Sequence, residues 1–413
     1  MNRAARIGIL LLSAAIFGYA GIGHVLGRTQ DEKAYKSLTV YGEVLQKVQQ
    51  DYVDDPDMHT VTAGSLHGML ESLDSQSSYL TPREYAEYKK KLANAGTAET
   101  GLTLSKRYGY IIVLSVLPDS PGTKAGIRSG DIFEAISGFT TRDMSVGQAL
   151  NLLNGQPGTG IKVAVIRRGK ATPEEVDVVR EKLPTSKIIL QKVDPDILVL
   201  RIPSLDSGRA DEIRNRLLDA EKQGIHKVIL DVRECGRGQV SEAISTARLF
   251  VPSGILTTLR GQTVSAQVFS AEPKQVIWKN PVSVLIDATT SGAAEVLASA
   301  IGANHRGDVV GERTFGLASE QKLITLDDGA ALILTVANYY NPGGKSIMEE
   351  GVTPTEVVRA VAEDDSDTTD EESAPTPAEA QKEPGLGPRP LSPEDPIFHR
   401  ALDLLKAPVK KAA

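Results

Sequence analysis

The chain has 413 residues, of which 41% are hydrophobic, 5% aromatic and 24% charged, so it is long enough for two or three domains. Its net charge of −7 equals the contribution of one acidic run, Glu363–Glu372, and the chain shows no basic stripe of the kind that binds nucleic acid. One cysteine, Cys235, cannot form an intramolecular disulfide, and six scattered histidines lack metal-ligand spacing, so we expect no metal and no other cofactor.

The first 28 residues contain an uncharged run, Ile7–Gly27, which is about long enough to cross a bilayer as a helix. Arg3 and Arg6 precede this run, and basic residues in that place keep the N-terminus in the cytoplasm and send the rest of the chain across. No clean Ala-x-Ala site follows, so an uncleaved anchor is favoured over a signal peptide. We expect an extracytoplasmic, periplasmic body that is tethered to the cytoplasmic membrane, or secreted after signal cleavage.

Apolar residues then recur every three or four positions between Tyr35 and Val53, and again between Leu66 and Leu73. This spacing predicts amphipathic helices, so residues 29–97 are interpreted as a helical N-terminal region. Residues 98–182 have a different pattern, with short β-rich runs separated by Pro-Gly, Ser-Gly and Gly-x-Gly turn signals. We therefore predict a compact β domain there.

Residues 183–358 alternate continuous apolar strands with helices, which indicates an α/β core around a largely buried sheet. The predicted strands are Ile197–Ile202, Val228–Val232, Val282–Ile286 and Val309–Val310, and the predicted helices are Ala210–Gln223, Ser241–Phe250 and Ala293–Ala303. Residues 359–395 are acidic and Pro-rich and lack apolar content, which predicts a disordered linker. In residues 396–413 a short helix, Pro396–Leu405, either docks on the core or remains solvated.

Four motifs in this order resemble the carboxyl-terminal processing (tail-specific) peptidases: Gly68–Tyr85, Val116–Gly138, Ser145–Thr159 and Val284–Gln321. The resemblance covers roughly Tyr35–Val358. It implies an α/β multidomain protein, with a helical N-terminal region, an inserted PDZ domain and a crotonase-like serine peptidase core.

The resemblance places the carboxylate-binding loop of the PDZ domain at GLTL, which comprises Gly101, Leu102, Thr103 and Leu104. A peptide can add as a strand beside such a loop, so the implied partners are the C-terminal tails of other proteins. Leu102 and Leu104 would flank the pocket for the last side chain. A plain β-turn at Gly101 is the alternative.

Members of this family use a serine nucleophile, a lysine base and a glutamine as the third catalytic residue. A gapless alignment over Val284–Gln321 places Gly292 at the nucleophile, Leu317 at the base and Gln321 at the third position. The hydroxyl and the amine that this chemistry needs are therefore both missing. The resemblance consequently implies a non-catalytic homologue that acts as an adaptor or regulator. Such a protein could act alone, as a homo-oligomer or as a hetero-oligomer with an active paralogue.

The loop that forms the oxyanion hole in the family also differs. Glu234 and Cys235 replace Asn-Asn, and the oxyanion-loop position itself is occupied by Gly236, Arg237 and Gly238. We expect Glu234 to bring negative charge near a developing oxyanion, which would oppose catalysis.

Two other classes of function remain open. Ser291, one residue before the lost nucleophile, is a fallback nucleophile for an active serine endopeptidase, although one residue at a helix start turns a side chain by about 100°. Cys235 would need a histidine base, and a buried inert cysteine is the commoner case. A decayed homologue that binds nothing is the third interpretation.

Overall fold

The computed structural model describes residues 36–93, 98–107, 109–142, 144–167, 172–183, 185–359 and 395–407. The predicted anchor and nearly all of the predicted acidic linker lie outside these ranges. Within them, no helix is both long enough and apolar enough to cross a membrane. The chain divides after Ser65 into two compact units, and each is described by itself.

The first unit contains the predicted N-terminal helix, which spans residues 36–51, and the start of α2 (Met58–Glu71). The Tyr41 hydroxyl lies 2.5 Å from Ser65 Oγ. Most of the predicted apolar stripe is solvent-accessible, because Leu38 is 64% exposed and Val44 is 55% exposed. The periodicity thus predicted the helix correctly. The apolar side chains of this stripe, however, do not form a buried core within the first unit.

The second unit begins with the end of α2, followed by β1 (Ser78–Leu80) and α3 (Pro82–Ala93). Glu84 fixes the start of α3, because its carboxylate accepts hydrogen bonds from the Thr81 amide and hydroxyl, each at 2.8 Å. Leu80 and Tyr85 pack on Ala331. This contact attaches the helical region to β16 (Ala331–Tyr340), a strand of the second sheet of the core, which is described below.

The inserted domain is a partly open β-sheet with strand order β2-β3-β4-β6-β7, and β5 pairs with β4. Helix α5 begins at a capping box, in which Ser145 accepts from the Gln148 amide and the Gln148 side chain accepts from the Ser145 amide. The elements are β2 (Leu102–Arg107), β3 (Tyr110–Val116), α4 (Pro121–Lys124), β4 (Ile132–Ile136), β5 (Phe139–Thr140), α5 (Val146–Leu153), β6 (Gly160–Ile166) and β7 (Glu174–Val179).

The core is built on a sheet with strand order β17-β14-β13-β10-β9-β8, in which all neighbours are parallel except β8 and β9. The central strands β9, β10, β13 and β14 are buried along nearly their whole length, which explains their continuous apolar sequences, whereas the edge strand β8 is largely exposed. The strands are β8 (Ile189–Asp194), β9 (Ile197–Arg201), β10 (Lys227–Asp231), β13 (Val282–Ile286), β14 (Asp308–Gly311) and β17 (Glu356–Val357).

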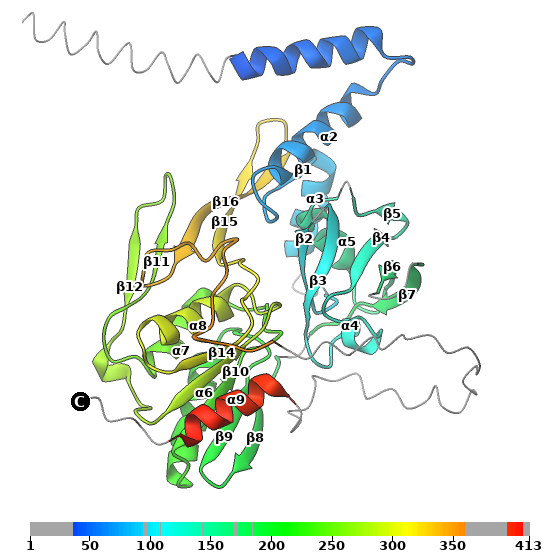
Figure 1. Cartoon of the computed structure of the whole chain (residues 1–413). Helices are drawn as coiled ribbons and strands as arrows, with labels where there is room; N and C mark the ends of the chain where they lie inside the picture. Colours follow the sequence, from blue (N-terminus) through cyan, green and yellow to red (C-terminus); the bar gives the residue numbers. More distant parts are fainter. Residues whose placement is uncertain are drawn as a thin grey trace, which may run out of the picture. The chain divides into compact units, whose positions relative to one another are not determined.

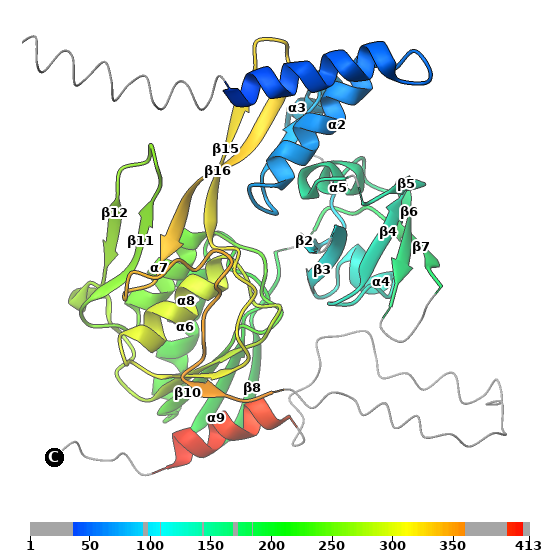
Figure 2. The same ribbon diagram turned by 45° about the horizontal axis from the view of Figure 1, so that its top comes forward.

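Helices cover this sheet on both sides (Figures 1 and 2). One face packs on α6 (Arg209–Lys222), α7 (Val240–Arg248) and α8 (Ala293–Ala303). The opposite face receives α9 (Pro396–Lys406), through residues that include Ile397, Phe398, Ala401 and Leu405. Of the two alternatives for this segment, the structure thus has the docked helix.

An ion network holds the start of α9 on the core. Asp395 caps the helix by accepting from the amides of Ile397 and Phe398, and its carboxylate pairs with Arg233 at 2.6 Å. Arg233 also pairs at 2.8 Å with Asp231, which is fully buried. The guanidinium and its hydrogen bond lower the pKa of Asp231 against the effect of burial. The network ends one residue before Glu234, where the oxyanion-loop sequence begins.

A second sheet of the core was only partly predicted. Its order is β1-β16-β11-β12, and β15 pairs with β16. The segment Leu332–Ser346, which contains most of β16, resembles the family strand and turn that follow the active site, whereas the hairpin of β11 and β12 was not predicted. Its remaining strands are β11 (Ile255–Arg260), β12 (Gln267–Ser270), β15 (Ser319–Thr325) and β16 (Ala331–Tyr340), and η1 (Pro273–Gln275) is a short 3₁₀ turn.

Phe398→Ala tests the docking of α9. Removing this side chain, which is 5% exposed, should cost about 3 kcal/mol of local stability, and amides of residues 397–406 should exchange hydrogen about 100-fold faster. The measurement is hydrogen exchange by mass spectrometry. Asp403→Ala, on the exposed side of the same helix, should leave the exchange rates nearly unchanged. Equal protection in both variants would contradict a docked helix.

Candidate functional site

The turn between β13 and α8 carries Gly292, the residue that the alignment assigns to the nucleophile position; this position and that of Leu317 are called the former nucleophile and base positions below. Asp287 fixes this turn by accepting hydrogen bonds from the amides of Thr289 and Thr290, at 3.0 and 2.8 Å. Gly292 follows as the N-cap of α8 with φ +62° and ψ −119°, a conformation that strains residues with a side chain. A Cβ atom built at Gly292 meets no heavy atom within 4 Å. Position 292 therefore opens onto empty space.

One buried carboxylate joins this turn to the former base position. Glu295 is fully buried and accepts hydrogen bonds from the amides of Gly292 (2.8 Å), Gly316 (2.6 Å) and Leu317 (2.8 Å). A fourth bond comes from the Thr314 hydroxyl at 2.5 Å. Burial raises the pKa of Glu295 to about 7, although the four donors favour the ionised form. The nucleophile and base positions are thus held together through one side chain.

Both positions line a cavity of about 430 Å³. Leu317 is partly buried there, and Gln321 is exposed and donates to Ser319 Oγ at 2.8 Å. A leucine side chain cannot accept a proton, and Gly292 has no hydroxyl. The structure therefore brings the three aligned positions to one cavity, but their side chains cannot perform the serine-lysine chemistry.

The oxyanion loop lines the same cavity through Gly236, Arg237 and Gly238. Arg237 pairs with Glu99, at the start of the inserted domain, and with Asp206 of the core at 3.3 Å. These two ion pairs connect the loop to both domains. Sequence reasoning missed this role, because Glu99 and Asp206 are far from Arg237 in the chain.

Glu234 is not among the residues that line the cavity. Its carboxylate pairs with Arg201 at 3.3 Å, and its amide donates to Asp287 Oδ1. Burial raises the pKa of Glu234. The expectation that its charge opposes an oxyanion is therefore not supported, because a tertiary partner neutralises that charge outside the cavity.

The fallback nucleophile, Ser291, and the cysteine considered beside it, Cys235, are both buried. Ser291 is 1% exposed, and its Oγ has no hydrogen-bond partner among the described residues. A Cβ built on Gly236 would lie 2.8 Å from this oxygen, so the hydroxyl packs beneath the loop. Cys235 is buried, and burial raises the pKa of its thiol to about 12. No described residue thus accepts a hydrogen bond from the Ser291 hydroxyl, and Cys235 stays protonated at neutral pH.

The predicted peptide-binding segment, Gly101–Leu104, lines the cavity from the side of the inserted domain. Gly101 has φ +76°, and a Cβ there would lie 2.3 Å from Ser120 Cβ, so this position requires glycine. Strand β2 is an edge strand of its sheet, so a peptide can add beside it as a further strand. Leu150 of α5 lines the cavity as well, whereas Leu104 is 3% exposed and belongs mainly to the domain core.

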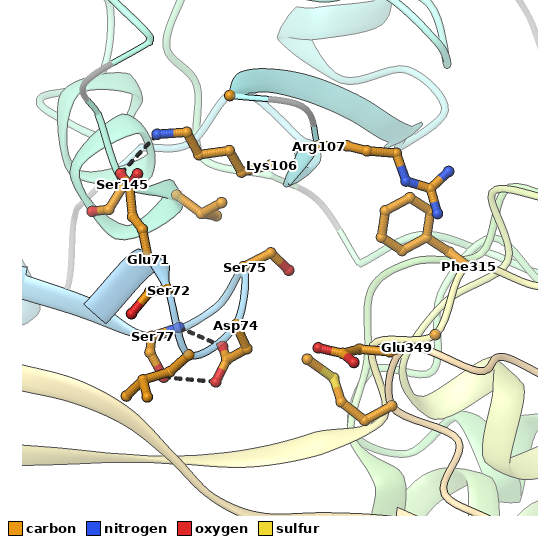
Figure 3. Close-up of a pocket in the computed structure, with 15 residues that line it drawn as sticks. Glu71, Ser72, Asp74, Ser75, Ser77, Lys106, Arg107, Ser145, Phe315 and Glu349 are labelled. Atoms are coloured by element: carbon orange, nitrogen blue, oxygen red, sulfur yellow. Dashed lines mark hydrogen bonds and ion pairs between the residues drawn. The ribbon is translucent and has the colours of Figure 1, made fainter. Parts of the chain in front are cut away.

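A second cavity, of about 600 Å³, is lined by residues that include Phe315 and Gly316, immediately before Leu317 (Figure 3). The guanidinium carbon of Arg107, at the end of β2, lies 4.8 Å from the centre of the Phe315 ring. This cation–π contact joins the inserted domain to the segment that carries Leu317. Sequence reasoning did not identify it. Among the described residues, no group of three or more His, Cys, Asp or Glu side chains is placed to hold a metal ion.

Comparisons with known proteins agree with this architecture. Residues 196–358 match peptidase family S41, and residues 112–167 match the PDZ domain. The carboxy-terminal-processing protease of Bartonella bacilliformis is 29% identical over 336 residues, which cover 79% of this chain and 76% of that protein. The carboxy-terminal processing protease CtpA of Bacillus subtilis is 26% identical over 361 residues, which cover 86% and 77%.

A solved structure described as the photosystem II D1 C-terminal processing protease has the same fold, with a TM-score of 0.64 at 23% identity. The alignment covers 78% of this chain and 92% of that one. The core is therefore a peptidase family S41 domain into which a PDZ domain is inserted. The chain is a homologue of the carboxyl-terminal processing peptidases.

Glu295→Gln tests the buried carboxylate through the pH dependence of stability. The pKa of Glu295 is about 7 in the folded chain, against an ordinary value of 4.5. Between pH 4.5 and pH 7, the folded chain therefore keeps a proton on Glu295 that the unfolded chain has released. The stabilisation by Glu295 therefore decreases as the pH rises through this window. Urea titrations should show that wild type loses stability relative to Glu295→Gln from pH 4.5 to 7.5. Glu221→Gln, on an exposed glutamate of α6, should show no such trend. A difference that is constant or grows with pH would contradict the assignment.

Proposed function

We propose that this chain captures the C-terminal tails of other proteins through its PDZ domain and does not hydrolyse them. The proposal is carried by the alignment that assigns Gly292 and Leu317 to the nucleophile and base positions of the family, and it is supported by the cavity that both residues line and by their amide bonds to Glu295. Proteolysis by the serine-lysine mechanism needs a hydroxyl and an unprotonated amine there. A binding module needs only the loop at Gly101 and the PDZ groove, by which we mean the part of the cavity that Leu102 and Leu150 line.

The proposal includes a location and a role. The basic residues before the apolar run Ile7–Gly27 support an extracytoplasmic body that is tethered to the cytoplasmic membrane, or secreted after cleavage. In that compartment the chain would act as an adaptor or regulator that delivers or withholds tails. A homo-oligomer, or a hetero-oligomer with an active paralogue, is consistent with this role and rests on analogy with family members.

An active endopeptidase with Ser291 as a displaced nucleophile is the competing function. We expect the full chain in detergent to resist labelling by a fluorophosphonate probe and to leave casein and apolar-tailed peptides intact, because Ser291 is buried and lacks a base. Labelling is read by mass spectrometry and cleavage by chromatography. Labelling together with cleavage, both lost in Ser291→Ala, would show an enzyme with a rebuilt centre.

Gly101→Ala tests tail capture itself. The added Cβ would lie 2.3 Å from Ser120 Cβ and must displace the carboxylate-binding loop, so binding of a fluorescent apolar-tailed peptide should weaken by at least about tenfold. The readout is fluorescence anisotropy on the full chain. Gly158→Ala is the matched control, because Gly158 has a similar φ of +79° but its Cβ would meet nothing within 4 Å.

Equal weakening in Gly101→Ala and Gly158→Ala would point to general destabilisation, and unchanged binding in Gly101→Ala would contradict the loop assignment. Absence of binding by the wild-type chain would favour the third interpretation, a decayed homologue.

A further inference from the structure

We propose that the former catalytic centre serves as an apolar anchor pocket for the captured tail, with Leu317 as its specificity-determining residue. The inference rests on the proposed function, because it assumes that tails are captured at all. It adds a second contact site, contributed by the core, to the PDZ groove. It also defines the ligand class: C-terminal tails with a bulky apolar side chain close to the terminal carboxylate.

The first observation is that the groove and the former centre form one cavity. Leu102 and Leu150 line it from the PDZ domain, and Leu317 lines it from the core. Ala293 and Ala318, which are buried, add small apolar surfaces beside Leu317. A tail held at Gly101 by its carboxylate therefore lies in the same cavity as Leu317. Burying an apolar side chain against such surfaces is favourable.

The second observation is that Leu317 is held in place. Its amide and that of Gly316 donate to the buried Glu295 carboxylate, at 2.8 and 2.6 Å. The two residues before Leu317 are also bonded, because the Phe315 amide donates to Thr290 O at 3.1 Å and Gly316 O accepts from the Glu349 amide at 3.0 Å. The backbone of Leu317 is thus ordered before a ligand arrives. A preorganised contact surface loses less conformational entropy on binding, which favours affinity.

The third observation is the empty space at Gly292. A Cβ there meets no heavy atom within 4 Å, and Gly292 lines the cavity beside Ala293. A side chain at this position would fill part of that space, whereas glycine leaves it for the ligand. Polar residues line the cavity too, among them Glu99 and Arg237, which pair with each other. The space at Gly292 lies beside Ala293, in the part of the lining that includes Leu317, and burying an apolar side chain against these two residues is favourable.

The test measures binding of three fluorescent peptides to the full chain in detergent by anisotropy. The peptides differ only in their last two residues, which are Leu-Leu, Ala-Ala or Lys-Lys. Wild type should prefer the Leu-Leu peptide. Leu317→Ala should weaken binding of that peptide by about tenfold and change binding of the Ala-Ala peptide little, because only the bulky side chain loses its contact. Leu317→Lys should weaken it at least as much, since an ammonium group would enter the apolar wall.

Two variants serve as controls for folding and chemistry. Leu317→Met keeps a similar apolar volume and should retain the preference. Leu218→Ala makes the same deletion on the exposed face of α6, where Leu218 is 38% exposed, and should bind as wild type does. Thermal melts of each variant establish that the chain is folded.

The outcomes separate this inference from the proposed function. If wild type binds the Leu-Leu peptide and Leu317→Ala binds it equally well, the anchor pocket is wrong while PDZ capture stands. If Leu317→Met loses the preference as fully as Leu317→Ala, an apolar anchor at this position is also wrong. If wild type binds none of the three peptides, the proposed function fails and the anchor pocket fails with it.

Discussion

The buried carboxylate of Glu295 is the interaction on which the rest of this site depends. Placing a carboxylate away from water is unfavourable unless hydrogen bonds replace its hydration, and Glu295 obtains four of them. Those four bonds tie the start of α8 to the segment Thr314–Leu317. The former nucleophile and base positions therefore keep a common geometry, although neither residue can take part in proton transfer.

The exclusion of water from the cavity at position 317 has different consequences for a lysine and for a leucine. A lysine in a water-poor pocket can become a base, because burial lowers its pKa. A leucine in that pocket instead gives an apolar surface whose contact with a ligand is favourable for the same physical reason, the exclusion of water. With leucine at the position that aligns with the lysine of the family, the role that we propose for this cavity is binding. Leu102 and Leu150 of the PDZ domain line the same cavity, which is why the proposal connects Leu317 with the captured tail.

The alternating elements of the core were predicted well because their signals are local. The strand Val282–Ile286 has the bounds expected from its apolar run, and α8 agrees with its predicted range because Gly292 and the Glu295 capping contact mark its start. The β11–β12 hairpin was missed, since parts of it are exposed and lack a clear alternation. The ion pair of Glu234 was not predicted, because its partner, Arg201, lies far away in the chain, at the end of β9.

The sequence by itself determined the family, the order of the domains and which chemical groups are missing, because residue identity decides whether a hydroxyl or an amine exists. Only the tertiary structure decided what surrounds those positions. It brought Gly101, Leu150 and Leu317 to one cavity, buried Ser291 beneath Gly236, paired Arg237 with both domains and docked α9 on the sheet. These contacts join residues far apart in the chain, and their energies depend on burial and distance, which no local pattern of residues encodes.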